Sequence, residues 1–390
     1  MKNKLITSAF ELSKAIDKIN KVKKSKNTLP VLDNYLVTVN EKETSITGSD
    51  LENTLTVKLK TENYKEDFKF LLTFDSIALI KKLDKTPISI EYDNETCNID
   101  IFTENGKYSY QTEEWENFPQ FNFDKVINSF ELDFEDLHTG INKTLWSVST
   151  DELRPILTGV NIKSENNVLK ICGTDGNTLS VYTKEVEDSI FDSVSIPDFN
   201  IILNPKISKI ITGYKTKDFH SVKFEIVERE FESYSSKQSE KHIDTVRLYL
   251  HNEIFESRLI EGKFVNYDAV IPDYTNYSVS INKKDILKSL ERLSLVANQA
   301  SDMVKINRED NKLLLSAQDL DFNRSGLESV YCEYENVFEE CAFKSERLQK
   351  SIKQTESDNI KFDFTQPNNG MCIREKNLLI MVMPFNLDKM

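Results

Sequence analysis

The same order of sequence signals occurs three times along this chain of 390 residues. Each copy begins with an amphipathic helix and continues through a strand, a polar turn and a second strand. Further on, each copy has a short second helix and then a strand of alternating apolar and polar residues. Asp50, Asp175 and Asp319 lie in the three polar turns, at equivalent points of the repeat. A pattern repeated at near-thirds of a chain predicts three similar α+β domains, each with two helices packed on antiparallel sheets.

The apolar periodicity places six helices along the three copies. First helices are expected at residues 8–24, 134–148 and 283–297, and second helices at residues 74–83, 204–214 and 344–352. Pro, Asn and Asp interrupt the periodicity between the copies, so domains are expected at residues 1–125, 126–272 and 273–390. Residues 228–243 are polar and weakly patterned, and we expect them to form a loop insertion in the middle domain.

The charged residues are unevenly distributed. Acidic residues outnumber basic ones by 64 to 50, and the net charge of −14 argues against a protein that coats nucleic acid with its whole surface. The basic residues nevertheless gather on the expected helices: Lys14, Lys18 and Lys21 share a face of the first helix, Lys26 follows it, and the other helices carry Lys81, Lys82, Lys206, Lys209, Lys284, Lys288, Arg292, Lys350 and Lys353. A single face of this kind is usually a solvated helix surface. Five cationic helices out of six in an acidic chain instead predict one basic surface, which would hold phosphates without reading sequence.

Several classes of protein are disfavoured. The chain has neither a signal peptide nor a run of about 18 apolar residues, so a cytoplasmic protein without a membrane partner is expected. Its cysteines (Cys97, Cys172, Cys332, Cys341 and Cys372) are widely spaced and form no CxxC pair, which predicts buried thiols rather than disulfides or a zinc site. No phosphate-binding glycine loop and no metal-ligand spacing of histidines occurs, so no cofactor, metal or catalytic residue is expected.

Two acidic pairs leave an enzymatic alternative open. Asp50 with Glu52, and Asp319 with Asp321, could hold Mg²⁺ as in a nuclease. Both pairs lie in hairpin turns, where aspartate is favoured because it accepts hydrogen bonds from the backbone. The turn interpretation is preferred, and a metal-dependent DNA-processing enzyme such as a nuclease is the alternative function. A monomeric scaffold without a role on DNA is a third hypothesis.

Longer motifs resemble a known family along essentially the whole chain. TLPVLDNYLV followed by TGSDLENTL resembles the N-terminal domain of the bacterial DNA polymerase III beta subunit, the DNA sliding clamp. DELRPILTGVNI followed by GTDGNTL is similar to its middle domain, and the terminal MVMPFNL to the end of its third. The resemblance implies a non-catalytic processivity factor: a head-to-tail homodimeric ring of clamp domains that encircles double-stranded DNA without sequence preference. It also implies an ATP-dependent clamp loader as a partner.

The resemblance further implies a pocket for a linear motif carried by DNA polymerase subunits and other proteins, an extended peptide rich in Gln, Leu and Phe. Matched residue by residue, its walls would be Leu157, Thr174, Gly176, Leu179, Val270, Tyr334, Met381, Val382, Met383, Pro384 and Phe385. Methionine suits such a pocket because its flexible side chain adapts to different apolar anchors. The chain departs from the family pattern at Asn177, Thr178 and Ala269, which leaves the preferred motif open.

Two further sets of residues follow from the resemblance alone. Tyr108 and Tyr110 match one side of the family's dimer interface, and Leu295 and Val296 match the other; plain core packing is the alternative for both pairs. Lys26 and Arg154 match DNA contacts of the family, although Pro155 and Ile156 stand where an aromatic pair usually follows that arginine.

Overall fold

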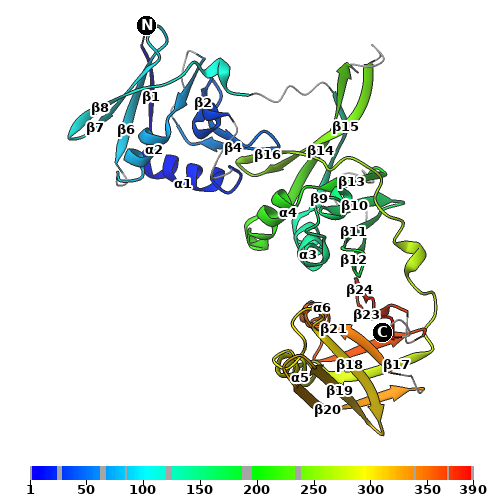
Figure 1. Cartoon of the computed structure of the whole chain (residues 1–390). Helices are drawn as coiled ribbons and strands as arrows, with labels where there is room; N and C mark the ends of the chain where they lie inside the picture. Colours follow the sequence, from blue (N-terminus) through cyan, green and yellow to red (C-terminus); the bar gives the residue numbers. More distant parts are fainter. Residues whose placement is uncertain are drawn as a thin grey trace. The chain divides into compact units, whose positions relative to one another are not determined.

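The computed structural model describes residues 2–23, 29–61, 67–83, 86–119, 125–186, 196–232, 239–336, 340–366 and 369–387, without the side chains of residues 229–243. The chain forms two compact units, which are coloured along the sequence in Figure 1. The first unit comprises Met1–Leu137 and Lys206–Leu259, and the second comprises His138–Pro205 and Ile260–Met390. The middle third of the sequence therefore supplies segments to both units.

The first unit contains two antiparallel sheets. One has the strand order β1-β6-β7-β8, with β1 Lys2–Ser8, β6 Pro87–Asp93, β7 Asn98–Thr103 and β8 Gly106–Gln111. The other has the order β5-β2-β3-β4-β16-β15-β14-β9, with β5 Phe68–Leu72, β2 Tyr35–Val39, β3 Thr44–Ser49, β4 Asn53–Leu59, β16 Glu253–Arg258, β15 Ser239–Leu250, β14 Ser221–Glu232 and β9 Lys125–Asp133. Helices α1 (Ala9–Ile19) and α2 (Phe74–Ile80) belong to this unit and bury apolar residues at helical spacing, such as Leu12, Ile16 and Ile77.

The second unit is built on one antiparallel sheet with the order β13-β10-β11-β12-β24-β23-β22-β17-β20-β19-β18-β21. Its strands are β13 Phe199–Leu203, β10 Val160–Glu165, β11 Val168–Thr174, β12 Thr178–Glu185, β24 Leu378–Val382, β23 Met371–Glu375, β22 Asn359–Phe364, β17 Tyr277–Asn282, β20 Arg324–Glu335, β19 Lys312–Asp319, β18 Met303–Glu309 and β21 Cys341–Lys344. Helices α5 (Lys283–Leu293) and α6 (Ser345–Lys353) pack on each other, and Leu290 and Leu348 are fully buried in the core.

The remaining helices include α3 (Phe134–Thr144) and α4 (Pro205–Thr212), together with the 3₁₀ turns η1 Pro30–Asp33, η2 Trp115–Asn117, η3 Leu145–Ser147, η4 Pro155–Leu157, η5 Thr216–Asp218 and η6 Asp268–Val270. The α+β class is confirmed, with helices near all six predicted positions. The first helices end earlier than predicted because their last residues form turns: α1 ends at Ile19 and α5 at Leu293. Within the described ranges no helix is long and apolar enough to cross a membrane.

Two details differ from the sequence predictions. The expected loop insertion at residues 228–243 belongs largely to strands, because β14 continues to Glu232 and β15 begins at Ser239; residues 233–238 lie outside the described part. Polar residues can extend a hairpin in this way when its backbone groups pair with each other. Four cysteines are buried as predicted, namely Cys172, Cys332, Cys341 and Cys372, but Cys97 is only half-buried.

Each large sheet crosses from one repeat to the next through a single strand pair, which we call a seam. In the first seam β4 pairs with β16, so that Asn53 lies opposite Ser257. In the second seam β12 pairs with β24, so that Thr178 lies opposite Val382. In both cases the strand that follows a polar turn joins the last strand of the next repeat. Backbone hydrogen bonds therefore continue across the repeats, and the edges of these strands are satisfied.

Two strands of the same kinds remain outside the seams. They are β20, which follows the Asp319 turn, and β8, the last strand of the first repeat. In the described chain β8 pairs only with β7. β20 pairs with β17 only from Cys332 onward, so Arg324–Tyr331 has β19 on one side and no described strand on the other. Each unit thus has an open strand edge, and the two edges are the counterparts of the strands that form the seams.

Candidate functional site

The second unit contains a pocket of about 470 Å³ where the second seam ends. Its lining residues come from η4, the turn between β11 and β12, the segment before and through η6, the loop between β22 and β23, and the end of β24: Leu157, Thr174, Gly176, Asn177, Thr178, Leu179, Val265, Asn266, Tyr267, Val270, Pro272, Thr365, Asn369, Gly370, Met381 and Met383. Most of its surface is apolar, and amide and hydroxyl groups are interspersed along the walls. Such a pocket suits apolar side chains of an extended segment.

One wall of the pocket is a rigid turn built by Asp175. Oδ1 of Asp175 accepts hydrogen bonds from the backbone N–H of Asn177 (2.8 Å), the backbone N–H of Thr178 (2.6 Å) and the Thr178 hydroxyl (2.9 Å). Thr174 closes the same turn by donating to the carbonyl of Thr178 at 2.6 Å. Gly176 has a φ of +88°, a conformation that favours glycine. The turn therefore holds its residues at the pocket wall in one geometry.

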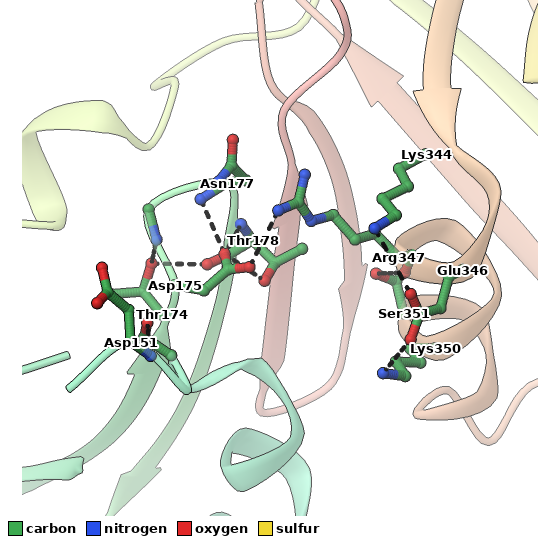
Figure 2. A network of polar contacts seen from close by, with 12 residues as sticks. Asp151, Thr174, Asp175, Asn177, Thr178, Lys344, Glu346, Arg347, Lys350 and Ser351 are labelled. Atoms are coloured by element: carbon green, nitrogen blue, oxygen red, sulfur yellow. Dashed lines mark hydrogen bonds and ion pairs between the residues drawn. The ribbon is translucent and has the colours of Figure 1, made fainter. Parts of the chain in front are cut away.

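The same aspartate also binds helix α6. Oδ2 of Asp175 lies 3.4 Å from the guanidinium nitrogen of Arg347. Figure 2 shows the Arg347 side chain reaching from α6 toward the turn that carries Asp175, Asn177 and Thr178. Neither partner is fully exposed, so this ion pair is screened less by salt than a pair on the open surface. The pair joins the second repeat to the third beside the pocket.

The floor of the pocket is formed across the second seam, where Leu179 on β12 lies opposite Met381 on β24. A Cβ added to Gly370 would lie 2.7 Å from the Met381 sulfur, so this glycine lets the methionine occupy its position. Tyr267 is buried, and its hydroxyl has no hydrogen-bond partner among the described residues. Burial also raises the pKa of Tyr267, so its phenol stays neutral and the pocket carries no charge there.

The structure brings seven of the sequence-predicted pocket residues together at the pocket: Leu157, Thr174, Gly176, Leu179, Val270, Met381 and Met383. Four others do not line it. Val382 is fully buried in the hydrophobic core, and Tyr334 packs on that core beneath the guanidinium of Arg308. Pro384 and Phe385 lie beyond the pocket, and the backbone N–H of Phe385 donates to Ala342.

Sequence reasoning missed other wall residues. Asn177 and Thr178, which depart from the family pattern, both line the pocket, whereas Ala269, the third departure, does not. Their position in the Asp175 turn is a signal that could have identified them. Thr365, Asn369 and Gly370 come from the loop between β22 and β23. Nothing in their local pattern marks them, because only the pairing of β22, β23 and β24 brings this loop to the pocket.

The predicted cationic residues fall into three groups. Lys18 binds the carboxylate of Glu253, which is 1% exposed, and Lys206 binds Asp50 with a 2.6 Å contact. Others pair with acids at the surface: Lys81 with Asp17, Arg154 with Asp151, Lys284 with Asp358, Arg292 with Glu328, Lys350 with Glu346, and Lys353 with Glu291. Lys14, Lys21, Lys82, Lys209 and Lys288 have no ion-pair partner among the described residues, and Lys26 lies outside them.

A second cavity, of about 450 Å³, lies in the first unit beside the end of α1. It is lined by Asn20, Lys23, Asp33, Tyr35, Phe74, Ile77, Ala78 and Lys81. Nζ of Lys23 lies over the Tyr35 ring, 3.7 Å from its centroid, and donates to the carbonyls of Asp33 (2.8 Å) and Asn34 (3.2 Å). Burial lowers the pKa of Lys23 to about 8, against the attraction of Asp33, and burial raises the pKa of Tyr35 to about 12.

Three of the four predicted dimer residues, Tyr108, Tyr110 and Val296, lie on or against the strands with open edges. Tyr108 and Tyr110 are on β8, and Tyr108 is exposed. Leu295 follows α5 and is 75% exposed. Val296 packs against Gly326 on β20, since a Cβ added to this glycine would lie 2.8 Å from the Val296 side chain. Further exposed apolar residues stand on β20 and in the turn before it: Leu320, Phe322, Leu327 and Tyr331. An apolar strand edge of this kind is a site for pairing with another chain.

The acidic pairs show no metal-binding geometry. No group of three or more potential ligands gathers anywhere in the described ranges. Oδ1 of Asp50 accepts from the backbone N–H of Asn53 at 2.8 Å, and Oδ1 of Asp319 accepts from that of Asp321 at 3.2 Å. These are the backbone hydrogen bonds that the turn interpretation predicts.

Comparison with known proteins gives the same family along the chain. The family model of the DNA polymerase III beta subunit, N-terminal domain, matches residues 4–122; the central-domain model matches residues 131–266, and the C-terminal-domain model matches residues 268–382. The beta sliding clamp of Synechocystis sp. is 24% identical over 98% of this chain and 99% of its own length, and that of Bacillus subtilis is 23% identical over 96% and 95%.

Solved structures of low sequence identity share the fold. The DNA polymerase III subunit beta from Pseudomonas aeruginosa matches with a TM-score of 0.86 at 18% identity, covering 99% of this chain and 100% of its own. The DNA polymerase III beta subunit from Thermotoga maritima matches with a TM-score of 0.81 at 20% identity, covering 99% and 100%.

The depressed pKa of Lys23 makes a prediction about stability. Between the folded pKa of about 8 and the ordinary value of 10.5, the unfolded chain binds more protons at this lysine than the folded chain does. The free energy of unfolding should therefore rise with pH through that window because of Lys23. Tyr35 acts in the opposite direction only above its ordinary value of 10.0. Urea unfolding at pH 7.5 and 9.5 should show a larger gain for the wild type than for Lys23→Met, and equal gains would contradict the assignment.

Proposed function

The chain belongs to the DNA polymerase III beta subunit family, and we propose that two copies of this sliding clamp close head to tail into a ring around double-stranded DNA. A sliding clamp is a processivity factor and not an enzyme, and nothing in the comparisons favours the nuclease alternative. The observation that carries the ring proposal is the pair of open strand edges, β8 and β20, which are the counterparts of the two seams within the chain. A second copy would supply each edge with its missing neighbour.

The register of the proposed third seam follows from the first two. Three residues are equivalent because each lies opposite the aspartate of its own hairpin: Asn53, Thr178 and Arg324. The backbone N–H of Asp50 donates to the carbonyl of Asn53, and that of Asp175 donates to the carbonyl of Thr178. Arg324 is the strand partner of Asp319. Ser257, Val382 and Tyr110 are equivalent, because each lies four residues after the start of its last strand. In the seams Ser257 faces Asn53, and Val382 faces Thr178. Tyr110 of one protomer should therefore face Arg324 of the next.

The side chains at this register suit an interface. Tyr108 would lie opposite Gly326, which leaves room for its ring, and Lys107 would lie opposite the exposed Leu327. Leu295 and Val296 follow α5, and Val296 packs against Gly326 of β20. Removing these apolar groups from water favours association, and backbone pairing sets the alignment of the strands.

We propose that α1, α2, α4, α5 and α6 face the DNA. Lys14, Lys21, Lys82, Lys209 and Lys288 are available for phosphates, because no acid in the described part of the chain pairs with them. Lysines in exposed ion pairs, such as Lys350 with Glu346, can exchange a carboxylate for a phosphate at little cost. Lys18 and Lys206 bind buried acids and stabilise the first unit instead. Such contacts are sensitive to salt and independent of sequence.

We propose that the pocket of the second unit binds the linear motif of polymerase subunits and other partners. Met381 and Met383 adapt to apolar anchors, and Asn177, Asn266 and Asn369 offer hydrogen bonds to a peptide backbone or to a Gln side chain. An ATP-dependent loader is a further proposed partner, because a closed ring cannot thread onto circular DNA.

We also propose a cytoplasmic location. The proposed domains are residues 1–125, 126–272 and 273–390, and the three ranges matched by the family models support this division.

Retention on circular DNA tests the ring. The protein, loaded onto nicked circular DNA by a cognate loader, should co-elute with the DNA on gel filtration at moderate salt and leave it after a restriction enzyme linearises the circle. The reason is that topology rather than affinity holds a ring in place. Equal retention on circular and linear DNA would contradict the proposal, and Mg²⁺-dependent cleavage of the circle would favour a nuclease.

Peptide binding tests the pocket. Val270→Glu places a charge on an exposed part of the wall, and it should weaken binding of a labelled peptide carrying Gln, Leu and Phe by at least about tenfold, because an apolar anchor would bury against a carboxylate. Leu153→Glu is the matched control, since Leu153 is 91% exposed and does not line the pocket. Fluorescence anisotropy gives both affinities. Wild-type affinity in the Val270→Glu variant would place the peptide elsewhere.

Cysteine cross-linking tests the register of the third seam. By the same alignment Ser109 should face Ser325, in a hydrogen-bonded pair whose Cα atoms lie about 5.5 Å apart. The variant with Ser109→Cys and Ser325→Cys should form an intermolecular disulfide under mild oxidation, visible as dimer on non-reducing gels. Ser109→Cys with Ser329→Cys is the control, because four residues along the strand separate the thiols by about 13 Å. Cross-linking of the control instead would show a different register.

A further inference from the structure

Both seams within the chain have an ion pair of the same construction. Asp50 Oδ2 lies 2.6 Å from Nζ of Lys206, and Asp175 Oδ2 lies 3.4 Å from a guanidinium nitrogen of Arg347. The acid stands in the hairpin turn before the seam strand, and the cation stands in the first turn of the second helix of the next repeat, α4 or α6. The pair at the second seam is visible in Figure 2.

Helix α2, the second helix of the first repeat, lacks a cation at the positions that carry Lys206 in α4 and Arg347 in α6. Strand pairing aligns the residues that precede the three second helices, namely Thr73 before α2, Asn204 before α4 and Lys344 before α6. Asp75 of α2 therefore occupies the position of Lys206 in α4. Ser76 of α2 occupies the position of Arg347 in α6. Ser76 is buried and its hydroxyl donates to the carbonyl of Thr73, whereas Asp75 is exposed. A third seam that copied the other two would place the Asp75 carboxylate against that of Asp319. Two like charges at that point would oppose association.

A cation is present on the other side of this arrangement. Arg324 lies directly opposite Asp319 in the hairpin of β19 and β20. At the equivalent positions the side chains of Asn53 and Thr178 hydrogen-bond their aspartates, at 3.3 Å and 2.9 Å. Arg324 therefore stands where the hairpin acid meets the helix of the next repeat. In the single chain its guanidinium lies over the Phe322 ring, and it has no ion-pair partner among the described residues.

The electrostatics of β8 support the same position of Asp75. Burial, then the negative charge of Asp75, raises the pKa of Tyr110 on β8, so the carboxylate lies near that phenol. Tyr110 is the residue that the derived register sets opposite Arg324. The helix alignment and the strand register are independent of each other, and both bring Asp75 and Arg324 together.

We propose that Arg324 of one protomer forms an ion pair with the partner's Asp75, which reverses the polarity of the two pairs within the chain. This inference rests on the proposed head-to-tail ring. The reversal gives the proposed third seam an arrangement of charges that differs from the arrangement at the two seams within the chain. A β20 edge that met α4 or α6 in place of α2 would set Arg324 against Lys206 or Arg347, and this repulsion selects the correct partner edge.

Charge exchange at the two positions tests the inference. Sedimentation of the full chain should give a dimer dissociation constant at least about tenfold weaker for Arg324→Glu, because three carboxylates would then face one another. Adding Asp75→Lys to that variant should restore the constant to within about threefold of the wild type, since the new lysine meets both Glu at 324 and Asp319. Asp75 and Arg324 are both exposed in the single chain, so each variant should keep the wild-type circular-dichroism spectrum, which shows that its fold is intact.

A matched control separates a specific pair from general attraction. Glu41→Lys makes the same change of charge at an exposed position of the first unit, at the opposite end of β3 from the Asp50 turn. Combined with Arg324→Glu it should not restore the dimer. If Arg324→Glu dimerises like the wild type, or if Glu41→Lys rescues as well as Asp75→Lys, the ion pair is refuted while the ring stands. If the wild type itself is a monomer at all accessible concentrations, the ring proposal fails.

Discussion

Pairing of strand edges between successive repeats is the interaction on which the rest of the structure depends. An unpaired edge exposes backbone N–H and C=O groups that attract other strands. Each repeat offers two edges of the kind that forms the seams, one on the strand after its polar turn and one on its last strand. Within the chain β4 pairs with β16, and β12 pairs with β24, so two pairs of edges satisfy each other. The described chain is left with one open edge of each kind, which is why a second copy is the natural partner.

The pocket is a consequence of the second seam. β24 ends at Val382, but the backbone N–H of Met383 still donates to the carbonyl of Asn177, so the chain continues along the Asp175 turn for one more residue. Side chains alternate along a strand. Met381 and Met383 consequently point to the pocket, while Val382 points into the core. A run of residues that looks uniform in the sequence is divided between two faces by this alternation.

This division shows what the sequence could and could not predict. The threefold repeat predicted the helices and the hairpin turns, because both depend on local periodicity and turn chemistry. Resemblance supplied the pocket wall but treated Met381–Phe385 as one surface. The contribution of Asn369 and Gly370 was missed, since strand pairing far from the turn brings that loop to the pocket. The partners of the lysines were equally invisible: Lys18 and Glu253 are 235 residues apart, and Lys206 and Asp50 are 156 apart.

Those partners change how the cationic helices work. A lysine bound to a buried acid, as Lys18 is to Glu253, is held because the buried carboxylate would lose its ion-pair partner if the lysine moved. A lysine paired at the surface, as Lys350 is with Glu346, gains little from that pair and can leave it for a phosphate. Besides the lysines that have no ion-pair partner among the described residues, the helices thus carry two classes of paired cation: one stabilises the seam, and the other can exchange its carboxylate for a phosphate. Exchange between equivalent weak contacts gives no position along a duplex a marked advantage, and this is the energetic condition for sliding.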